Sequence, residues 1–553
     1  MSGSSFRPTP ADALATIRAY HARTQHHVYA YARALGYLDW ATQPDPFRRY
    51  AGAARVRLPL RRPDGRVRFA EVCAGSVVPV GVDVVSVAQL FEDSLALSAW
   101  KKAGGNRWAL RVNPSSGNLH PTEGYLVCGP VAGLSETAAV WHYAPDEHAL
   151  ERRATLSTEA WAAVARDVPA DALLVGLSSI AWREAWKYGE RAYRYCMHDV
   201  GHALGALCYA AAALGWKATL VPLADAKLAA LLGLEAASSS PEAEHPDCLV
   251  AIHREEPASA AWARRFDLDA GALAALRAAQ WEGAPNALSG EHHPWPLIDD
   301  AIAATRLDDP APVACRDRGV RVAMRVASVP DACARALFRQ RRSAVAMDGT
   351  TGTDAATFFA MLQRATDAHA PPLAILPWQS RVHLLLFVHR VAGLPPGIYC
   401  LARGGRDPAW LRARTRKEFL WERAPGVPPD LPLFLLLPID CKALAQAVSC
   451  QQAIAADSAF ALGMLAEFAP TLAAFGAWGW RAVHWEAGAI GQLLYLEAEA
   501  AGLRATGIGC FFDSAVHEAS GISSDDLRTI YHFTTGGAVD DERLQTEPAY
   551  PGR

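Results

Sequence analysis

The sequence of 553 residues lacks the short motifs that mark several common enzyme classes. It contains no GxxxxGKS/T phosphate loop, no GxSxG turn around a nucleophilic serine, and no GxGxxG that follows a strand. The GTTGTD that begins at Gly349 has the wrong spacing. These absences argue against a classical dinucleotide-binding fold.

Clustered cysteines are also missing. The eleven cysteines, an odd number, are scattered without a CxxC pair or a Cys/His cluster at zinc spacing. His198 and His202 are four residues apart, as metal ligands on a helix can be, but no third ligand is near them in the sequence. We expect no metal site. We interpret six cysteines as small buried side chains in a reducing compartment: Cys73, Cys196, Cys208, Cys441, Cys450 and Cys510.

Long apolar runs and blocks of one charge are absent as well. The longest apolar run, at 431–439, is broken by two prolines, and the N-terminal residues lack the apolar segment of a secretory signal. The 54 basic and 57 acidic residues nearly cancel, with no basic block beyond short runs such as 412–417. We therefore expect a cytoplasmic protein that spans no membrane and binds no nucleic acid.

One motif occurs twice in the chain. The segment HDVGHALGALCYAAAALGWKATLVP at 198–222 is matched by HWEAGAIGQLLYLEAEAAGLRATGIG at 484–509. Because 553 residues are too many for one hydrophobic core, the repeat predicts two related domains. Aligning Gly201 with Gly488 also aligns Gly215 with Gly502, Ala218 with Ala505, Thr219 with Thr506, and Arg194 with Arg481.

The order of predicted elements is that of an α+β fold with a buried central helix in each half. We predict helices at 84–102, 193–214, 355–364 and 485–501, and strands at 108–112, 124–127, 173–177, 382–389 and 433–438. The predicted organisation is a helical N-terminal extension at 1–60, a first domain at 61–282, a linker at 283–316 and a second domain at 317–553.

Three segments carry groups that suit a flat, anionic ligand. The turn NPSSGNLHP at 113–121 offers hydroxyl, amide and backbone N–H groups, although a capped turn needs the same residues. Arg341, Arg342 and Ser343 suit a phosphate, since guanidinium forks match its oxygens; a solvated basic corner is the alternative. The backbone at 507–509 lets a flat ring approach closely, as a tight turn also would.

A fourth segment, WKYGER at 186–191, groups ionisable side chains just before the first copy of the repeat. A lysine pressed against aromatic rings can have its pKa lowered into the range for proton transfer, and a neighbouring tyrosine can donate. Lys187 and Tyr188 are therefore candidates for catalysis. The alternative is a helix start with surface ion pairs.

Together these segments resemble the nitroreductase family of FMN-dependent oxidoreductases, repeated in tandem, and the first half resembles the thiazole/oxazole-forming dehydrogenase branch. The resemblance implies two nitroreductase-like domains that form a pseudo-dimer within one chain, with FMN at their interface. The matching stretches lie at 111–127, 186–216, 341–349, 488–513 and 533–544.

The resemblance also implies a composite FMN site. Arg341, Arg342 and Ser343 would hold the phosphate, with Arg543 as a late basic residue; Pro114, Ser115, Ser116 and Asn118 would reach across from the first domain; and Gly507, Ile508 and Gly509 would pass the isoalloxazine ring. The complementary site lacks these groups, because PWQSR at 377–381 replaces the turn and no Arg-Arg-Ser stands at the matching distance in the first half. We therefore expect one FMN per chain.

In the azole-forming dehydrogenases a Lys-Tyr pair is tied to catalysis, and Lys187 and Tyr188 match it. The implied reaction removes a proton from an azoline-like heterocycle or an amino-acid-derived substrate, either a small molecule or part of a peptide, while hydride passes to flavin N5 and dioxygen reoxidises the flavin. Two alternatives stay open: an NAD(P)H-dependent nitro or quinone reductase, and a degenerate binding scaffold without turnover. Association between chains is also left open.

Overall fold

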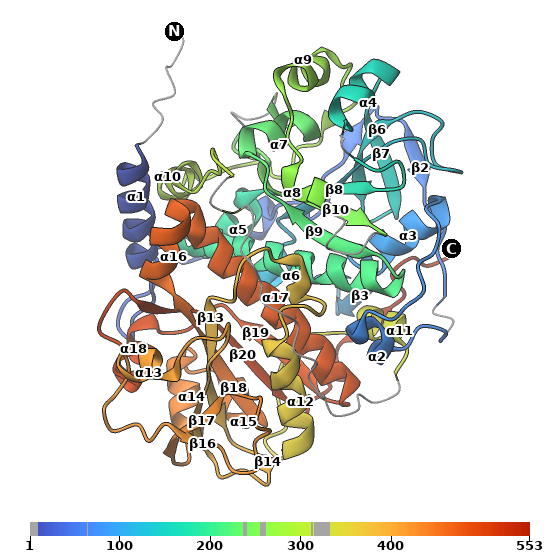
Figure 1. The fold of residues 1–553 in the computed structure, drawn as a ribbon. Helices are drawn as coiled ribbons and strands as arrows, with labels where there is room; N and C mark the ends of the chain where they lie inside the picture. Colours follow the sequence, from blue (N-terminus) through green and yellow to red (C-terminus); the bar gives the residue numbers. More distant parts are fainter. Residues whose placement is uncertain are drawn as a thin grey trace.

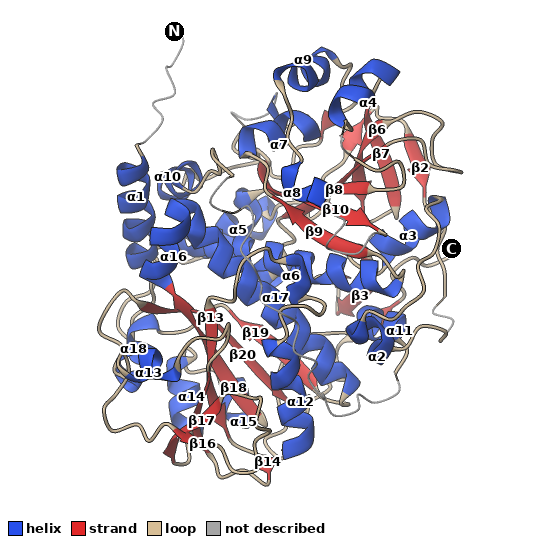
Figure 2. Ribbon diagram, viewed as in Figure 1, coloured by secondary structure: helices blue, strands red, loops and turns tan. Residues whose placement is uncertain are grey.

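The computed structural model of the protein describes residues 9–62, 65–166, 168–235, 240–254, 261–310, 313 and 332–552. Within these residues, two seven-stranded sheets lie apart, with a pair of long helices between them (Figures 1 and 2). Neighbouring strands in both large sheets are antiparallel. This α+β architecture confirms the predicted fold class.

The first large sheet has the strand order β2-β7-β6-β5-β8-β10-β9. Its strands are β2 (Arg55–Arg57), β5 (Thr122–Cys128), β6 (Ala139–Ala144), β7 (Ala149–Thr155), β8 (Leu173–Ser179), β9 (Lys217–Val221) and β10 (His245–His253). A separate small sheet joins β3 (Leu97–Ala103) and β4 (Asn106–Arg111) to β21 (Gln545–Glu547). The C-terminal tail therefore crosses to the first half of the chain.

The second large sheet has the order β16-β17-β15-β13-β18-β20-β19. Its strands are β13 (Val382–Val388), β15 (Gly397–Leu401), β16 (Glu422–Arg423), β17 (Leu433–Pro438), β18 (Phe460–Glu467), β19 (Arg504–Ile508) and β20 (Leu527–Gly536). We compared the two sheets without their edge strands β2 and β16. When the six remaining strands of each sheet are numbered by their position in the sequence, both sheets have the same spatial order of strands. The two halves therefore share one topology, as the repeated motif predicts.

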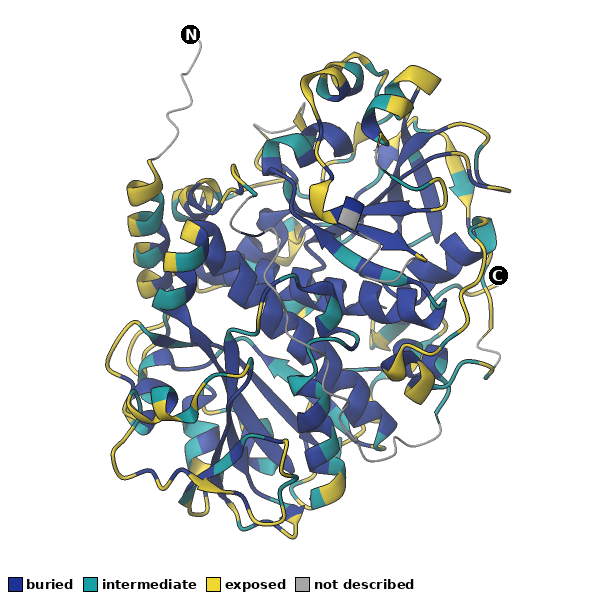
Figure 3. Ribbon diagram, viewed as in Figure 1, coloured by how far each residue is buried: buried dark blue, intermediate teal, exposed yellow. Residues whose placement is uncertain are grey.

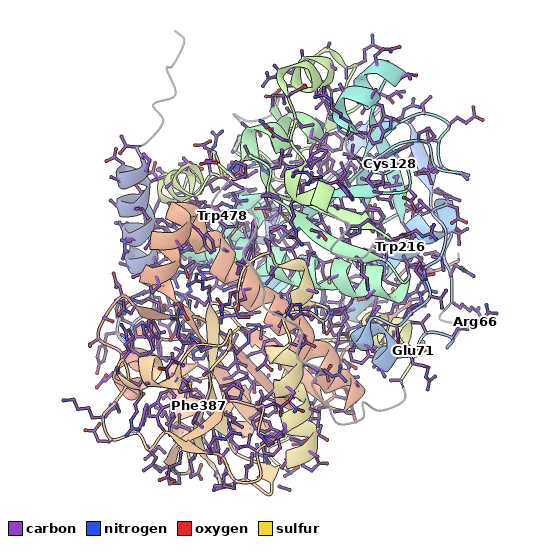
Figure 4. All side chains as sticks on the ribbon, viewed as in Figure 1. Arg66, Glu71, Cys128, Trp216, Phe387 and Trp478 are labelled. Carbon is purple, nitrogen blue, oxygen red and sulfur yellow. The ribbon has the colours of Figure 1, made fainter. Side chains whose placement is uncertain are left out.

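Side chains of the central strands alternate between an inner and an outer core, as the strand geometry requires. In β5, Leu126 and Cys128 pack into the core around the long helices, whereas Tyr125 and Val127 face the other way. Phe387 of β13, labelled in Figure 4, likewise belongs to the outer core. The outer helices are α4 (Thr158–Val164), α7 (Asp225–Leu232), α8 (Ala261–Arg265) and α9 (Ala270–Ala278) over the first sheet, and α13 (Pro408–Arg412), α14 (Lys442–Val448), α15 (Ile454–Asp457) and α18 (Asp513–Ser520) over the second.

The two long helices, α6 (Ala192–Ala213) and α17 (Gly479–Ala500), are buried along their whole length (Figure 3). They cross at the two glycines that the repeat aligns. A Cβ atom on Gly201 would lie 2.3 Å from the carbonyl oxygen of Trp485, and one on Gly488 would lie 2.2 Å from that of His198. The contact is reciprocal, so the pseudo-twofold axis passes between Gly201 and Gly488. None of the described helices combines the length and the apolar character that crossing a membrane requires.

Two buried ion pairs repeat the same symmetry. Arg194 of α6 lies 3.2 Å from Asp513 at the start of α18, and Arg481 of α17 lies 2.6 Å from Asp225 at the start of α7. Each pair joins one half of the chain to the other. Because a buried charge is costly without its partner, these pairs make the separation of the halves unfavourable.

Some predicted elements differ from those observed. The described part of the predicted helical extension holds two helical elements, α1 (Pro10–Arg23) and the 3-10 turn η1 (Trp40–Thr42), and the strands β1 (Tyr50–Ala51) and β2 also lie before its predicted end at residue 60. The predicted helix at 84–102 is wrong beyond α3 (Val84–Glu92), because the following residues alternate in burial and form β3. The predicted linker contains α10 (Pro296–Ala304), which packs on α1.

The remaining helices flank the inner core or connect its elements. They are α2 (Phe69–Ala74), α5 (Ala181–Tyr188), α11 (Ala334–Gln340), α12 (Ala355–Thr366) and α16 (Phe468–Phe475). Residues 317–331, with which the predicted second domain begins, lie outside the described residues. The domain boundaries at 60, 282 and 316 therefore remain a proposal.

The helix crossing can be tested by replacing Gly488 with Ala. Because the added methyl group would meet a backbone oxygen, the two helices must move apart, and we expect a destabilisation of about 3 kcal/mol, near the upper end for overpacking. Because the entropy of unfolding grows with chain length, this corresponds to an apparent Tm lower by roughly 3 °C in a chain of this size. Gly290→Ala is the control, since a Cβ atom there meets open space. An unchanged Tm for Gly488→Ala would contradict the close crossing.

Candidate functional site

A cavity of about 940 Å³ lies between the two halves of the chain. The first half contributes residues of the predicted turn at 113–118, and the second half contributes both predicted segments, at 341–343 and at 507–509. Segments that are hundreds of residues apart in the sequence are thus brought to one place. Within the described ranges, no cluster of three or more His, Cys, Asp or Glu side chains could hold a metal ion.

The turn of the first half owes its shape to two residues in the left-handed region. Gly117 has a φ of 58° and Asn118 a φ of 61°. The Asn118 side chain donates a hydrogen bond to the carbonyl of Ala109 at 2.6 Å, which ties the turn to β4. A Cβ atom on Gly117 would lie 2.5 Å from the hydroxyl of Tyr188, so glycine is needed there. The predicted catalytic tyrosine therefore packs directly on the predicted cofactor turn.

A carboxylate of the central helix holds this turn in place. Asp199 of α6 accepts hydrogen bonds from the backbone N–H and the hydroxyl of Ser116, both at 3.1 Å. Burial raises the pKa of Asp199 to about 7, against the lowering effect of its hydrogen bonds from Ser115 and Ser116. In the other half, Glu486 of α17 accepts a hydrogen bond from the N–H of Arg381 at 2.9 Å. The turns at 114–118 and 377–381 are therefore structural counterparts, as predicted.

The second half supplies buried positive charge to the cavity. Arg341 donates to the carbonyls of Val112 and Arg111, at 3.2 and 3.1 Å, and Arg342 donates to the carbonyl of Ser98 at 3.0 Å. Among the described residues, neither guanidinium forms an ion pair with a carboxylate. Burial and then the charge of Arg341 lower the pKa of Arg342 to about 10. The two arginines therefore form a site that attracts an anion.

Two further cations line the cavity beside them. Arg504 pairs with Glu499 at 2.6 Å, and Lys101 donates to the hydroxyl of Thr546 at 2.7 Å. Burial, followed by the charge of Arg342, lowers the pKa of Lys101. Glu499 and Asp540 are the carboxylates that act on these four cations, and Asp541 and Glu542 also line the cavity.

A hydrogen-bonded chain links the two predicted segments of the second half. The hydroxyls of Ser343 and Tyr495 lie 2.7 Å apart, and the N–H of Gly507 donates to Tyr495 at 3.0 Å. A Cβ atom on Gly507 would lie 2.0 Å from the hydroxyl of Tyr531, and one on Gly509 would lie 2.3 Å from the ring of Tyr195. Glycine is therefore required at both positions by the packing of tyrosines against the backbone.

Several buried polar atoms at the cavity find no hydrogen-bond partner among the described residues. They are Nε of Arg111, Oδ1 of Asn113, Nδ1 of His120 and Nδ1 of His202. A buried polar group without a partner costs about 1–3 kcal/mol. Atoms of this kind around one cavity are the signature of a ligand with its own donors and acceptors.

One residue of the predicted catalytic pair lies in the cavity wall, and the other lies beside it. Tyr188 lines the cavity, whereas Lys187 does not belong to the wall in the part of the chain that the structure describes. The Nζ atom of Lys187 lies 5.3 Å from the centre of the Tyr188 ring. On the same helix, Glu184 is fully buried, and neither of its carboxylate oxygens has a hydrogen-bond partner among the described residues. Burial and then the charge of Asp199 raise the pKa of Glu184.

Most of the other predicted residues line the cavity, and one does not. The residues in the wall are Pro114, Ser115, Ser116, Asn118, Arg341, Arg342, Ser343, Gly507, Ile508 and Gly509. The side chain of Arg543 is 86% exposed and pairs with Asp541 at 2.7 Å, so the structure does not bring it to the other cations.

Sequence reasoning did not single out several polar residues of the cavity wall, among them Lys101, Arg111, Asn113, Asp199, Tyr495 and Arg504. One of these residues could have been found from the repeat alignment, which aligns Asp199 with another carboxylate, Glu486. Asn113 lies within the predicted turn and was not singled out. The positions of Lys101 and Arg504 depend on how strands of two different sheets meet, which the spacing of residues does not reveal.

At the position related to the cavity by the pseudo-twofold axis, aromatic side chains are packed together. Trp378 replaces Ser115 of the first turn, and Phe475 stands where the repeat alignment places Tyr188. Their ring centres are 6.3 Å apart, and each lies close to Trp478, at 5.7 and 6.1 Å. Trp478, labelled in Figure 4, in turn contacts Trp485 of α17 at 5.5 Å. All four of these side chains are buried.

Comparisons with known proteins agree with this architecture. Residues 95–252 match the Nitroreductase family. The crystal structure of a putative nitroreductase from Anabaena variabilis ATCC 29413 is similar over 95% of this chain and 99% of its own, at 19% identity and a TM-score of 0.66. A search of curated proteins found no match.

Two other solved structures are similar to parts of the chain only. A putative nitroreductase from Ralstonia eutropha JMP134 covers 40% of this chain and 97% of its own, at 15% identity and a TM-score of 0.27. The E. coli microcin synthetase McbBCD complex with truncated pro-MccB17 bound covers 45% and 95%, at 16% identity and a TM-score of 0.27. Scores this low establish no shared fold. The family match and the Anabaena structure confirm the expected resemblance: residues 95–252 are a nitroreductase-family domain, and the chain has the nitroreductase fold over nearly its whole length.

Proposed function

We propose that the protein is an FMN-dependent oxidoreductase with a single flavin site, in the cavity between its halves. The observation that carries this proposal is the meeting of Arg341 and Arg342 of one half with the turn at 113–118 of the other around one cavity. The nitroreductase-family domain supports an oxidoreductase. The proposed site is incomplete in either half alone.

The groups around the cavity fit the parts of FMN. The phosphate suits Arg341 and Arg342, whose guanidiniums have no carboxylate partner among the described residues and offer planar forks of donors. The ring system suits the backbone at 507–509, which lines the cavity and in which Gly507 and Gly509, without side chains, are partly exposed. A volume of about 940 Å³ is within the range of pockets that enclose ligands of this size.

We propose that the reaction is a dehydrogenation of an azoline-like heterocycle or an amino-acid-derived substrate, either a small molecule or part of a peptide, with dioxygen as the electron acceptor. Bound FMN would supply two-electron redox chemistry. Burial raises the pKa of Tyr188, so its phenol stays protonated at neutral pH and can donate a hydrogen bond to the substrate. We assign the removal of the proton to Lys187, whose Nζ lies 5.3 Å from the centre of that ring.

The aromatic cluster supports a single flavin per chain. In the pseudo-symmetric position, Trp378 and Phe475 take the places of a hydroxyl and a phenol that face the cavity, so donors are replaced by rings. The segment that follows α2 in the first half, from Ser76 to Pro79, offers no arginine in place of the pair that follows α11. Both components of a second phosphate and ring site are therefore missing.

Replacing Arg342 with Ala tests the proposed phosphate contact. A hydrogen bond to a charged group contributes about 1.5–3 kcal/mol, so we expect the Kd for FMN to rise roughly 10- to 100-fold. The measurement is titration of the flavin-free protein by quenching of FMN fluorescence. Arg543→Ala is the matched control, because that side chain is exposed and paired with Asp541, and its Kd should stay within about twofold. Equal effects of the two substitutions would rule out the phosphate site as described.

Replacing Lys187 with Ala tests its role in proton transfer. A positioned acid or base contributes about 10²–10⁴-fold, so we expect kcat for an azoline-containing substrate to fall at least 100-fold while FMN remains bound. The readout is the rate of flavin reduction in a single turnover, with retained flavin measured in parallel. Lys417→Ala, a change of an exposed lysine in the second half, should leave the rate unchanged. An unchanged rate for Lys187→Ala would remove this residue from the mechanism.

A further inference from the structure

Two cysteines of the second half meet at the wall of the cavity. Cys450 and Cys510 are 60 residues apart in the chain, and their Sγ atoms are 2.8 Å apart. Both are partly exposed, so the sequence-based interpretation of these two as isolated buried side chains is wrong. The separation is longer than a disulfide bond of about 2.05 Å but closer than two sulfur atoms that merely pack together.

Two loops hold the sulfur atoms in this position. Cys510 follows Gly509 at the end of β19 and lines the cavity, whereas Cys450 follows α14. The side-chain amide of Gln452 donates to the carbonyls of Ser449 at 2.9 Å and Cys510 at 3.0 Å, and so joins the two loops. The hydrogen bonds of Gln452 therefore hold the two cysteine-bearing loops together.

The backbone at Cys450 is strained. Cys450 has a φ of 54° and Gln451 a φ of 61°, in the left-handed region that residues with side chains rarely adopt. Such strain costs of order 1–3 kcal/mol for each residue, persists only where surrounding contacts enforce it, and clusters at functional sites. Here the strained residues are those that direct one thiol toward the other.

The surroundings distinguish the two thiols. Cys510 adjoins Gly509, whose carbonyl accepts a hydrogen bond from Arg191 at 3.0 Å, so a buried cation lies close to this thiol. The contact with Cys450, and then the hydrogen bond with His26, lower the pKa of Cys510 despite its burial. The same contact raises the pKa of Cys450. Cys510 is thus the nucleophilic member of the pair and Cys450 the member that retains its proton.

We propose that Cys450 and Cys510 form a redox-active dithiol at the cavity wall, whose substrate is a low-molecular-weight disulfide of the glutathione type. The Sγ of Cys510 attacks one sulfur of that disulfide, whose S–S bond breaks, and the first small thiolate leaves and takes a proton from water. Cys450 then loses its proton and attacks Sγ of Cys510, and the second small thiolate leaves with that proton. The protein loses two electrons and gains an internal disulfide, while the small disulfide is reduced to two thiols.

This site is independent of flavin binding but shares a wall with the proposed flavin site. Cys510 and Gln452 line the same cavity as Gly507 and Gly509. Oxidation would remove the negative charge of one thiolate from that wall and would link the loop after α14 covalently to the end of β19. The redox state of the pair therefore alters the surface against which a ligand of the cavity lies.

The test uses the full-length protein and needs no flavin. The protein is equilibrated at pH 7.5 with mixtures of reduced and oxidised glutathione, quenched with acid, treated with N-ethylmaleimide and analysed by mass spectrometry after digestion. We expect two thiols to be lost together in one transition, in a peptide that links Cys450 to Cys510, and to be restored by dithiothreitol. Both thiols remaining modified by N-ethylmaleimide at every ratio, or two separate glutathione adducts without the internal link, would overturn the proposal.

Single substitutions separate the roles of the two thiols. Cys450→Ser should stop the reaction at a glutathione adduct on Cys510, whereas Cys510→Ser should slow oxidation of the remaining thiol at least tenfold. Cys333→Ser is the matched control, because Cys333 is also partly exposed and is placed on another element, and it should behave as the unsubstituted protein. If Cys450 formed the adduct as fast in Cys510→Ser as Cys510 does in Cys450→Ser, the assignment of the nucleophile would be wrong.

Discussion

The close crossing of α6 and α17 is the contact on which the rest of the structure depends. Gly201 and Gly488 bring the two backbones together so tightly that no side chain fits between them. The ion pairs of Arg194 and Arg481 then fix each helix to the opposite half. Since each sheet packs against this helix pair, the crossing determines which loops of the first half meet which loops of the second.

The pseudo-twofold axis between Gly201 and Gly488 relates two equivalent positions, and side chains of different chemistry occupy them. One is a cavity lined by cations and by polar atoms, some of which have no hydrogen-bond partner among the described residues, and the other contains the rings of Trp378, Phe475, Trp478 and Trp485. A fully buried apolar side chain stabilises a fold by roughly 1.5–3 kcal/mol, whereas each unpartnered polar atom costs about 1–3 kcal/mol. Rings fill the aromatic position, although the indole N–H groups of Trp478 and Trp485 also lack partners among the described residues, whereas the proposed ligand would pair with the polar atoms of the cavity.

Much of this arrangement follows from the sequence because it depends on local patterns. The repeat around Gly201 and Gly488 predicts both central helices and their relation, and the turn at 113–121 stands out by composition alone. The helix at 84–102 was predicted too long because its apolar spacing continues into β3, where pairing with β4 decides the conformation. Tertiary pairing of this kind overrides local propensity.

The parts of the site that escaped prediction are those fixed by long-range geometry. Lys101 and Arg504 join the arginine pair only because β3 and β19, strands of different sheets, both border the cavity. Arg543 matches a family pattern in order along the chain, yet a local ion pair with Asp541 turns it outward. Cys450 and Cys510 lie in separate loops without a CxxC spacing, so no sequence motif marks them as a pair.

The proposed function depends on one composite ligand site in a chain of two similar halves. The most direct measurement is the flavin stoichiometry: purified protein is saturated with FMN, freed of unbound ligand, and the FMN released on denaturation is compared with the protein concentration. We expect one FMN per chain. Two FMN molecules per chain, bound with similar affinity, would contradict the asymmetry between the cavity and the aromatic cluster.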